Sequence, residues 1–202
     1  VSVFGVTIDF GWVGHIIAAF YLVWLLNLYN FMDGIDGIAG VEAVTACFGA
    51  CLIYWLGGFE SLVWAPLLLA AAVLGFLCWN FPPARIFMGD AGSGFLGIIL
   101  GIFSLQASSS APQLLWVWLI LLGVFIVDAT FTLLRRLMRG DKVYEAHRSH
   151  AYQFASRSAG RHLPVTVGVL MINLLWLLPI ALSVGVWGVD GMLGLLIAYV
   201  PL

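Results

Sequence analysis

The chain has 202 residues, of which 63% are hydrophobic and only 9% are charged, and its formal net charge is −2. A soluble globular domain carries about 25% charged residues, so this composition excludes an ordinary soluble enzyme. We predict an all-α, polytopic transmembrane helical bundle, because helices satisfy their own backbone hydrogen bonds inside lipid. We expect no nucleic-acid partner. The cysteines, Cys47, Cys51 and Cys78, lie in apolar runs without metal-binding spacing and are interpreted as small buried hydrophobic residues.

Apolar runs follow one another along the whole chain. They cover, in order, residues 12–30, 41–57, 61–80, 94–111, 113–134, 164–185 and the shorter 188–202. A transmembrane helix needs about 20 apolar residues, so we expect six to seven spans in one integral membrane domain, residues 1–202. No basic segment precedes the first run and Val1 is not a start residue. We therefore expect no signal peptide here and interpret the chain as the C-terminal part of a longer protein.

The first polar loop, residues 31–40, follows a series of oxygen-bearing side chains at the end of the first run. Asn27, Asn30, Asp33 and Asp36 recur every three residues, a spacing that places them on roughly one face of a helix end. Carboxylate and amide oxygens are the ligands that Mg²⁺ prefers. Ionisable groups at the margin of a span are costly and usually functional, so this series is a candidate site.

The second polar loop, residues 81–93, presents Asp90 on a glycine-rich turn just before the next apolar run. Ser93 is a candidate N-cap of that helix. A helix N-terminus with free amides and glycines nearby is suited to binding phosphate. The alternative is purely structural, with Asp90 stabilising the helix dipole. Because Asp33 and Asp36 are expected on the same side of the membrane, we favour a magnesium-diphosphate site.

The third polar loop, residues 135–163, carries most of the basic residues. Within it, three side chains that can bind anions lie within four positions: His147, Arg148 and His150. Arginine binds phosphate through two parallel hydrogen bonds, and histidine adds charge or hydrogen bonds. A zinc site is the alternative, but no cysteine or helical histidine pair completes one. His15 and His162 lack such company and are interpreted as structural or interfacial.

Two features lie inside the apolar runs. Gly97 and Gly101 form a small-residue pair at helical spacing, which favours close helix packing over catalysis. Asp128 lies within the 113–134 run, about two turns from its predicted end at the third loop. A carboxylate in a span needs a partner. The sequence leaves open whether Asp128 pairs with an arginine such as Arg135 or faces the site.

The three polar loops are predicted on one face of the membrane, because two spans separate each from the next. All the lysines and arginines lie in the second and third loops, at Arg85, Arg135, Arg136, Arg139, Lys142, Arg148, Arg157 and Arg161. The positive-inside rule makes that face cytoplasmic. We therefore expect one composite site on the cytoplasmic side of the cytoplasmic (inner) membrane.

The motifs NLYNFMDGIDG, FMGDAGSG and HRSH together resemble the polyprenyl-phosphate N-acetylhexosamine-1-phosphate transferases. This group, glycosyltransferase family 4, includes the phospho-N-acetylmuramoyl-pentapeptide translocases. The resemblance covers Asn27 to Gln153, and the third loop is most similar to the O-antigen-initiating branch. It implies a ten- to eleven-span enzyme that transfers a sugar 1-phosphate from a UDP-N-acetylhexosamine to undecaprenyl phosphate, releases UMP, and uses Mg²⁺ or alternatively Mn²⁺.

The resemblance assigns roles by motif. It makes Asp33, Asp36 and Asp90 catalytic, with Asp90 as the Mg²⁺ ligand and Asp33 as a second candidate ligand. The substrate-binding residues are then Asn27, Asn30, Asn80, His147, Arg148 and His150.

Two departures from the family pattern stand out. The acidic Asp-Asp pair of an earlier cytoplasmic loop occurs nowhere in this chain, which fits a missing N-terminal part, so the resemblance does not make this piece active alone. The usual His-x-His-His loop here reads His147-Arg148-Ser149-His150. Individual histidine roles therefore do not transfer.

Other functions remain open at this stage. A membrane transporter or lipid-linked sugar flippase also places polar residues in broken helices, and a non-catalytic scaffold would use the acidic loops only as helix caps. For the enzyme, direct attack by the lipid phosphate is preferred to an aspartyl-phosphate intermediate on Asp33 or Asp36. The sequence fixes neither the sugar nor the oligomeric state, for which a homodimer is one option.

Overall fold

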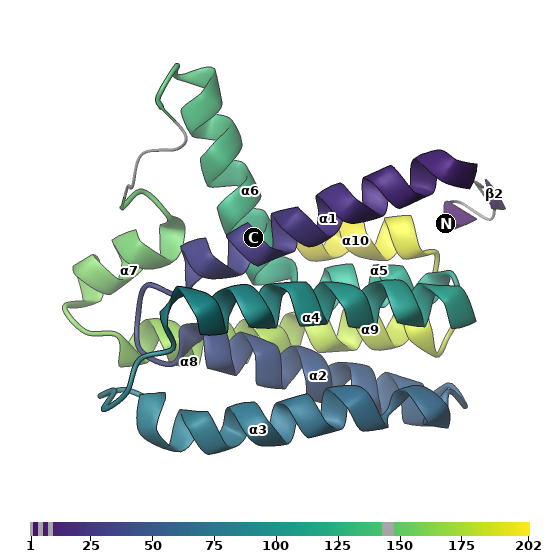
Figure 1. Ribbon diagram of the computed structural model, residues 1–202, viewed down its shortest axis with the longest axis horizontal. Helices are drawn as coiled ribbons and strands as arrows, with labels where there is room; N and C mark the ends of the chain where they lie inside the picture. The colour runs from purple at the N-terminus through teal and green to yellow at the C-terminus, as the bar shows by residue number, and fades with distance from the viewer. Residues whose placement is uncertain (1, 4–5, 8–9, 143–147) are drawn as a thin grey trace.

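The protein is a bundle of helices, seen in a computed structural model that describes residues 2–3, 6–7, 10–142 and 148–202 (Figure 1). Strands β1 (Ser2–Val3) and β2 (Val6–Thr7) pair as a minimal antiparallel ribbon. The helices within the described ranges are α1 (Gly11–Met32), α2 (Ile38–Leu56), η1 (Glu60–Leu62), α3 (Trp64–Asn80), α4 (Gly89–Ser110), α5 (Gln113–Leu121), α6 (Gly123–Met138), α7 (Ala151–Ala159), α8 (Leu163–Ile172), η2 (Asn173–Leu177), α9 (Leu178–Gly185) and α10 (Gly191–Tyr199).

The predicted all-α membrane bundle is confirmed. Within the described residues, five helices are long and apolar enough to cross a membrane, and a sixth span results if the bent pair α5–α6 counts as one. The last predicted run forms only α10, which has nine residues and is too short to span a bilayer. The chain is therefore a multi-pass membrane protein with five to six spans.

Helix α2 is the centre of the bundle. In its most apolar stretch 78% of the residues are buried, against 11% in α1. Small residues on α2 allow this close packing: Gly40 lies against Leu77 of α3, where an added Cβ would come within 2.7 Å of the leucine. Cys47 and Cys51 are buried on this helix, as expected for small hydrophobic residues. Cys78, on the outer helix α3, is exposed, so the expectation that it is buried is wrong.

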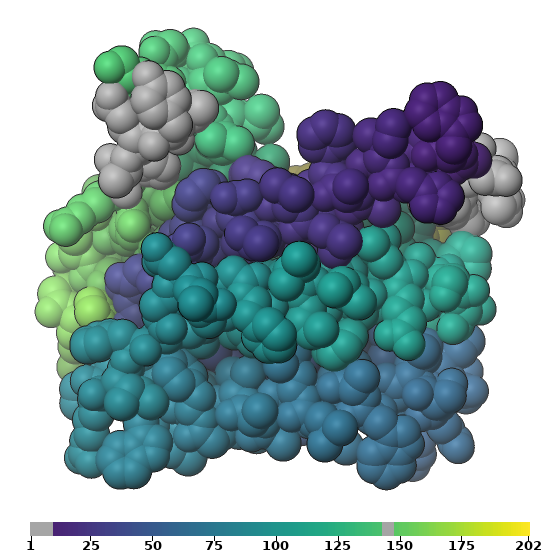
Figure 2. All heavy atoms as spheres, in the orientation of Figure 1, coloured from purple at the N-terminus to yellow at the C-terminus, as the bar shows by residue number. Residues whose placement is uncertain are grey.

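Helices α1, α4 and α3 cover one face of the molecule (Figure 2). Large apolar side chains on these helices are exposed, among them Trp12 and Phe20 on α1, Trp64 and Leu68 on α3 and Phe95 on α4. In water such a surface would aggregate. In a membrane protein it is the surface that meets lipid or further spans.

The pairing of α1 with α4 depends on the predicted small-residue pair. A Cβ on Gly97 would overlap the carbonyl of Leu25, and one on Gly101 would lie 2.8 Å from Leu22. The prediction that Gly97 and Gly101 serve helix packing is therefore confirmed. Because the two helices run in opposite directions, this contact sets the end of α1 beside the start of α4 (Figure 1).

The sequence predicts one straight span over residues 113–134, and this prediction is wrong. The run divides at Leu122 into α5 and α6, which are bent by 75°, and α6 leaves the bundle (Figure 1). The residues explain the difference, since α5 is apolar throughout, whereas α6 carries Asp128 and ends with Arg135 and Arg136. Of these polar groups, Asp128 accepts hydrogen bonds from the start of α7 and so ties α6 to that helix.

The three polar loops emerge at the same end of the bundle, as the span count predicted. Figure 1 shows the end of α1, the connection from α3 to α4 and the helix α7 on one side of the molecule. The sequence separates these segments by up to about a hundred positions. The fold thus brings the predicted motifs together, while the cytoplasmic location of this end stays a prediction.

Candidate active site

Two carboxylates, Asp33 and Asp90, form an acidic pair at the loop end of the bundle. Asp33 directly follows α1, and Asp90 lies in the first turn of α4. Burial, together with the charge of Asp90, raises the pKa of Asp33 to about 6. Within the described residues, no group donates a hydrogen bond to the Asp33 carboxylate. A partly buried acidic pair without a counter-charge is suited to a divalent cation.

Asp90 is placed by the start of α4, which differs from the prediction. The helix begins at Gly89, so Ser93 is not its N-cap but a residue of its second turn. The Ser93 hydroxyl instead donates to the carbonyls of Gly89 and Asp90, at 3.3 and 3.4 Å. Asp90 therefore lies on the helix itself, exposed at its N-terminus, where the dipole favours negative charge.

Asp36 lies only three residues after Asp33 but has a different environment. One carboxylate oxygen accepts a hydrogen bond from the Ala84 backbone N–H at 3.0 Å, and the other lies 3.0 Å from Nδ1 of His162. The Thr166 hydroxyl donates to the Asp36 carbonyl at 2.7 Å. The carboxylate of Asp36 thus ties the first loop to the second loop and to the start of α8.

Asn80 joins the same connection. Its side-chain oxygen accepts a hydrogen bond from the Gly37 backbone N–H at 3.0 Å, and its side-chain nitrogen donates to the Ile86 carbonyl at 2.8 Å. Asn80 is buried, so these bonds satisfy it without solvent. We call Asp36, Asn80 and His162 the loop anchor. His162, interpreted from the sequence as structural, takes part in it.

Asp128 holds the start of α7. It accepts hydrogen bonds from the backbone N–H groups of Ala151 and Tyr152, at 3.0 and 3.1 Å, and from the Thr132 hydroxyl at 3.1 Å. Nδ1 of His150 lies 3.2 Å from the same carboxylate, and the His150 side chain is buried. We call Asp128, His150 and Tyr152 the aspartate clamp.

The aspartate clamp resolves the question that the sequence left open. Within the part of the chain that the structure describes, the partners of Asp128 come from its own helix and from the start of α7, so Arg135 is not its partner. Tyr152 extends the clamp to the first motif, because its hydroxyl donates to the Phe31 carbonyl at 2.9 Å. The ring of Tyr152 also stacks on His150 at 5.8 Å. Sequence reasoning missed Tyr152, although it lies two residues after His150.

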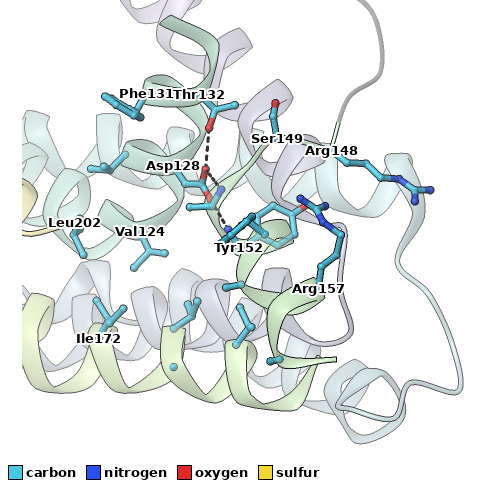
Figure 3. Close-up of a pocket in the computed structure, with 18 of the residues that line it drawn as sticks. Val124, Asp128, Phe131, Thr132, Arg148, Ser149, Tyr152, Arg157, Ile172 and Leu202 are labelled. Atoms are coloured by element: carbon cyan, nitrogen blue, oxygen red, sulfur yellow. Dashed lines mark hydrogen bonds between the residues drawn. The ribbon is translucent and has the colours of Figure 1, made fainter. Parts of the chain in front are cut away.

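An apolar groove of about 1250 Å³ opens between α6, α7 and α8 (Figure 3). Its lining is mainly aliphatic and aromatic, and includes Val124, Phe131 and Ile172. Three arginines also line it: Arg135, Arg148 and Arg157. Figure 3 places Arg148 and Arg157 at one end and Val124, Ile172 and Leu202 at the other, with Asp128 between. The groove therefore has a cationic end and an apolar end.

The remaining predicted residues are less informative. The Asn27 side chain donates back to the Val23 carbonyl at 2.7 Å, and Asn30 is half-buried beside Asp33. His147 lies outside the described residues.

Among the described residues, no group of three or more His, Cys, Asp or Glu side chains is placed to hold a metal ion. The zinc alternative gains no support from them, whereas Mg²⁺ often binds one or two carboxylates plus substrate phosphates.

These features define a class of protein: a polytopic membrane protein whose loops meet at one end to form an acidic site beside an apolar groove. Within that class, the chain belongs to glycosyl transferase family 4, whose family model matches residues 1–108. The resemblance seen in the sequence motifs is therefore confirmed at the level of the family.

Several curated proteins are similar to the chain. A probable undecaprenyl-phosphate N-acetylglucosaminyl 1-phosphate transferase of Bacillus subtilis is 30% identical over 146 residues, 71% of this chain and 41% of the relative. An undecaprenyl-phosphate alpha-N-acetylglucosaminyl 1-phosphate transferase of Thermotoga maritima is 31% identical over 122 residues, 59% of this chain and 41% of the relative. A phospho-N-acetylmuramoyl-pentapeptide-transferase of Endomicrobium trichonymphae is 40% identical over 80 residues, 38% of this chain and 21% of the relative. The chain thus spans about two fifths of the first two relatives.

Proposed function

We propose that this chain carries the loop face of an enzyme that transfers an N-acetylhexosamine 1-phosphate from a UDP-sugar to undecaprenyl phosphate and releases UMP. The observation that carries the proposal is the position of the acidic pair at the same end of the bundle as the cationic end of the apolar groove. The names of the relatives supply the substrate class. Because the chain spans only part of those relatives, the activity is assigned to the whole protein.

The groove suits the acceptor lipid. Its apolar lining matches a polyprenyl tail, and an arginine such as Arg148 or Arg157 binds a phosphate through paired hydrogen bonds. A lipid phosphate monoester has a second pKa of about 6, so it is largely a dianion near neutral pH. Such a group needs positive charge nearby more than it needs a general base.

The acidic pair suits the metal that binds the donor. Asp33 and Asp90 would hold Mg²⁺ or Mn²⁺ together with oxygens of the donor diphosphate. Burial, together with the charge of Asp90, raises the pKa of Asp33 to about 6, and a divalent ion bound to the pair would favour its ionised form. Bound there, the ion would reduce the repulsion between the acceptor phosphate and the diphosphate.

The reaction is a direct displacement at phosphorus. An oxygen of the lipid phosphate attacks the phosphorus that bears the sugar, the bond from that phosphorus to the bridging oxygen breaks, and UMP leaves with the electron pair. Arg148 would neutralise charge on the phosphates, and the aspartate clamp would hold His150 beside them. Asp36 is a poor nucleophile for the alternative covalent route, because both its oxygens are engaged in the loop anchor.

The biological setting follows from the same reasoning. We place the loop end on the cytoplasmic side of the cell inner membrane, since the basic residues lie in the loops that emerge there. The reaction would initiate O-antigen or another cell-envelope polysaccharide. The transporter alternative gains no specific support, because Asp128 lines the groove but is held by the aspartate clamp.

The test is UMP release in membranes containing the protein as its native locus encodes it. The assay would contain undecaprenyl phosphate, Mg²⁺ and a panel of UDP-N-acetylhexosamines. We expect release that requires the lipid and the metal, with one sugar preferred. Well-folded protein that releases no UMP with any sugar, but moves a lipid-linked sugar between leaflets, would replace the enzyme with the flippase.

A further inference from the structure

Glu42 is a fully buried carboxylate within the membrane-spanning helix α2. Its relative exposure is 0%, and it lies in the span Ile38–Leu56. A carboxylate inside a membrane-spanning helix is costly unless other polar groups bond to it. The partners of Glu42 therefore indicate its role.

The partners of Glu42 come from two other helices. The side-chain nitrogen of Asn173 donates to the Glu42 carboxylate at 2.6 Å, and lies 2.7 Å from the Thr45 hydroxyl. The backbone N–H of Phe125, in the first turn of α6, also interacts with the carboxylate. Asn173 begins the π-helical segment η2, and such segments often mark functional positions in helices.

These partners belong to the two walls of the apolar groove. Val124 and Ile172 line its apolar end, and each is the chain neighbour of a Glu42 partner, Phe125 or Asn173. Glu42 therefore lies behind this end, linking the wall formed by α6 to the wall formed by α8. Glu42 contacts the first turn of α6, immediately after the 75° bend between α5 and α6.

The polar cluster is not one that maximises stability. Within the described residues, the other oxygens of Glu42 and Asn173 have no hydrogen-bond partner, and neither does the hydroxyl of Tyr29, whose ring packs on Phe125 at 4.9 Å. Incompletely paired polar groups weaken a core. A buried polar contact can nevertheless fix one arrangement of packed helices among several.

We infer that Glu42 is a positioning residue that sets the spacing between the groove walls and thereby the affinity for the long tail of the acceptor lipid. The inference rests on the proposed function of the groove. It assigns no chemistry to Glu42. It requires that loss of the carboxylate affects the apolar end of the groove more than its cationic end.

The experiment compares Glu42→Ala and Glu42→Gln with wild type in the full-length protein. We expect Glu42→Ala to raise the KM for undecaprenyl phosphate about tenfold, with the KM for the UDP-sugar within about twofold of wild type. Glu42→Gln should have a smaller effect, because its amide oxygen can still accept from Asn173. A short acceptor such as farnesyl phosphate uses mainly the cationic end, so its KM should stay within about twofold.

Ser104→Ala is the matched control. Ser104 is also fully buried and bonds another helix, through Tyr21 at 2.9 Å, but it lies in the α1–α4 contact and does not line the groove. It should leave both KM values unchanged. If Glu42→Ala alters the KM for long lipid, short lipid and UDP-sugar equally, or if Ser104→Ala reproduces its pattern, the inference is wrong.

Direct binding separates this inference from the proposed function. Equilibrium binding of radiolabelled undecaprenyl phosphate to the purified protein needs no turnover. Wild-type binding without UMP release would refute the transferase but keep the role of Glu42, provided that Glu42→Ala weakens binding about tenfold. No binding by wild type, or equal binding by both proteins, would overturn the inference.

Discussion

Asp33 of the acidic pair and Asp36 of the loop anchor lie in the same loop, yet their carboxylates have opposite environments. Asp33 has no hydrogen-bond donor among the described residues and is repelled by Asp90, which helps to raise its pKa to about 6. Asp36 has a backbone N–H on one oxygen and His162 on the other. Three positions in the sequence thus separate a carboxylate that lacks partners from one that the fold satisfies.

The difference indicates which carboxylate serves chemistry and which serves architecture. A partly buried acidic group without partners destabilises the fold, and such strain is expected where a ligand supplies the missing charge. A carboxylate whose oxygens are both engaged is instead expected to hold loops in place. The family resemblance groups Asp33 and Asp36 together as catalytic residues, whereas their contacts separate them.

The largest expected effect is on catalysis, from Asp90→Asn. Loss of this carboxylate should lower lipid-dependent UMP release by about 10²–10³-fold, the range seen when one electrostatic group is removed from an active site. Folding should be unaffected, because Asp90 is exposed. Thermal unfolding of both purified proteins provides the control. Near-normal release by Asp90→Asn would remove the acidic pair from the metal site.

Asp128 adds a third case to this comparison of carboxylates, because it has hydrogen-bond partners and also holds His150, a candidate substrate-binding residue. Asp128→Asn keeps the size of the side chain but weakens its bonds to His150 and to the two backbone N–H groups of α7. We expect kcat/KM to fall about 10–100-fold, mainly through the KM for the UDP-sugar, as when a positioning partner is lost.

The kinetic pattern checks this role. His150→Ala should cause a similar loss, and the double variant should lose little more, because both residues act through one contact. Additive losses in the double variant would show that Asp128 and His150 act independently, which contradicts the aspartate clamp.

The parts of the fold that sequence predicted are those with local signals. The apolar runs predict the spans, and the spacing of Gly97 and Gly101 predicts a close helix contact, which is the one between α1 and α4. The shared end of the three loops followed from counting spans. The motifs also single out Asp33 and Asp90, because oxygen-bearing side chains at the margin of a span are costly. The structure brings the two carboxylates close together, while their catalytic role stays a prediction.

The parts that sequence did not predict depend on contacts between distant segments. His162 lies 126 positions from Asp36, and Asn173 lies 131 positions from Glu42. Neither pair has a local signature, so the sequence predicts neither contact. The bend at Leu122 is not predicted, because the run 113–134 is apolar enough to count as one span. The polar residues in its second half distinguish the part that becomes α6 from the part that becomes α5.

The loop anchor gives the next prediction, an effect on stability. Asp36→Asn should lower the free energy of unfolding by about 1–3 kcal/mol, the cost of weakening partly buried bonds to a charged group. Asp33→Asn, three residues earlier, should leave stability unchanged or raise it, because it removes repulsion from Asp90. Chemical denaturation in detergent measures both, and an equal loss in the two variants would remove the distinction between the regions.

The smallest expected effect is the pH dependence of that stability, and it tests Asp33 most directly. Burial, together with the charge of Asp90, raises the pKa of this carboxyl from its ordinary value of 3.8 to about 6, so the folded state holds its proton more tightly than the unfolded state. The contribution of Asp33 is therefore favourable at low pH and is lost as pH rises from about 4 through 6. The loss should be on the order of 1 kcal/mol, less than the full shift implies, because solvent partly screens the group.

Asp33→Asn is the matched comparison, since every other titrating group is unchanged in it. In metal-free buffer, the Tm of wild type should fall relative to that of Asp33→Asn between pH 4 and pH 7. Mg²⁺ should reverse this fall in wild type at pH 7, where the carboxylate is ionised, but have little effect at pH 4, where the proton occupies it. Parallel curves for the two proteins, with and without Mg²⁺, would mean that Asp33 is as well accommodated as Asp36, and the contrast between the acidic pair and the loop anchor would lose its physical basis.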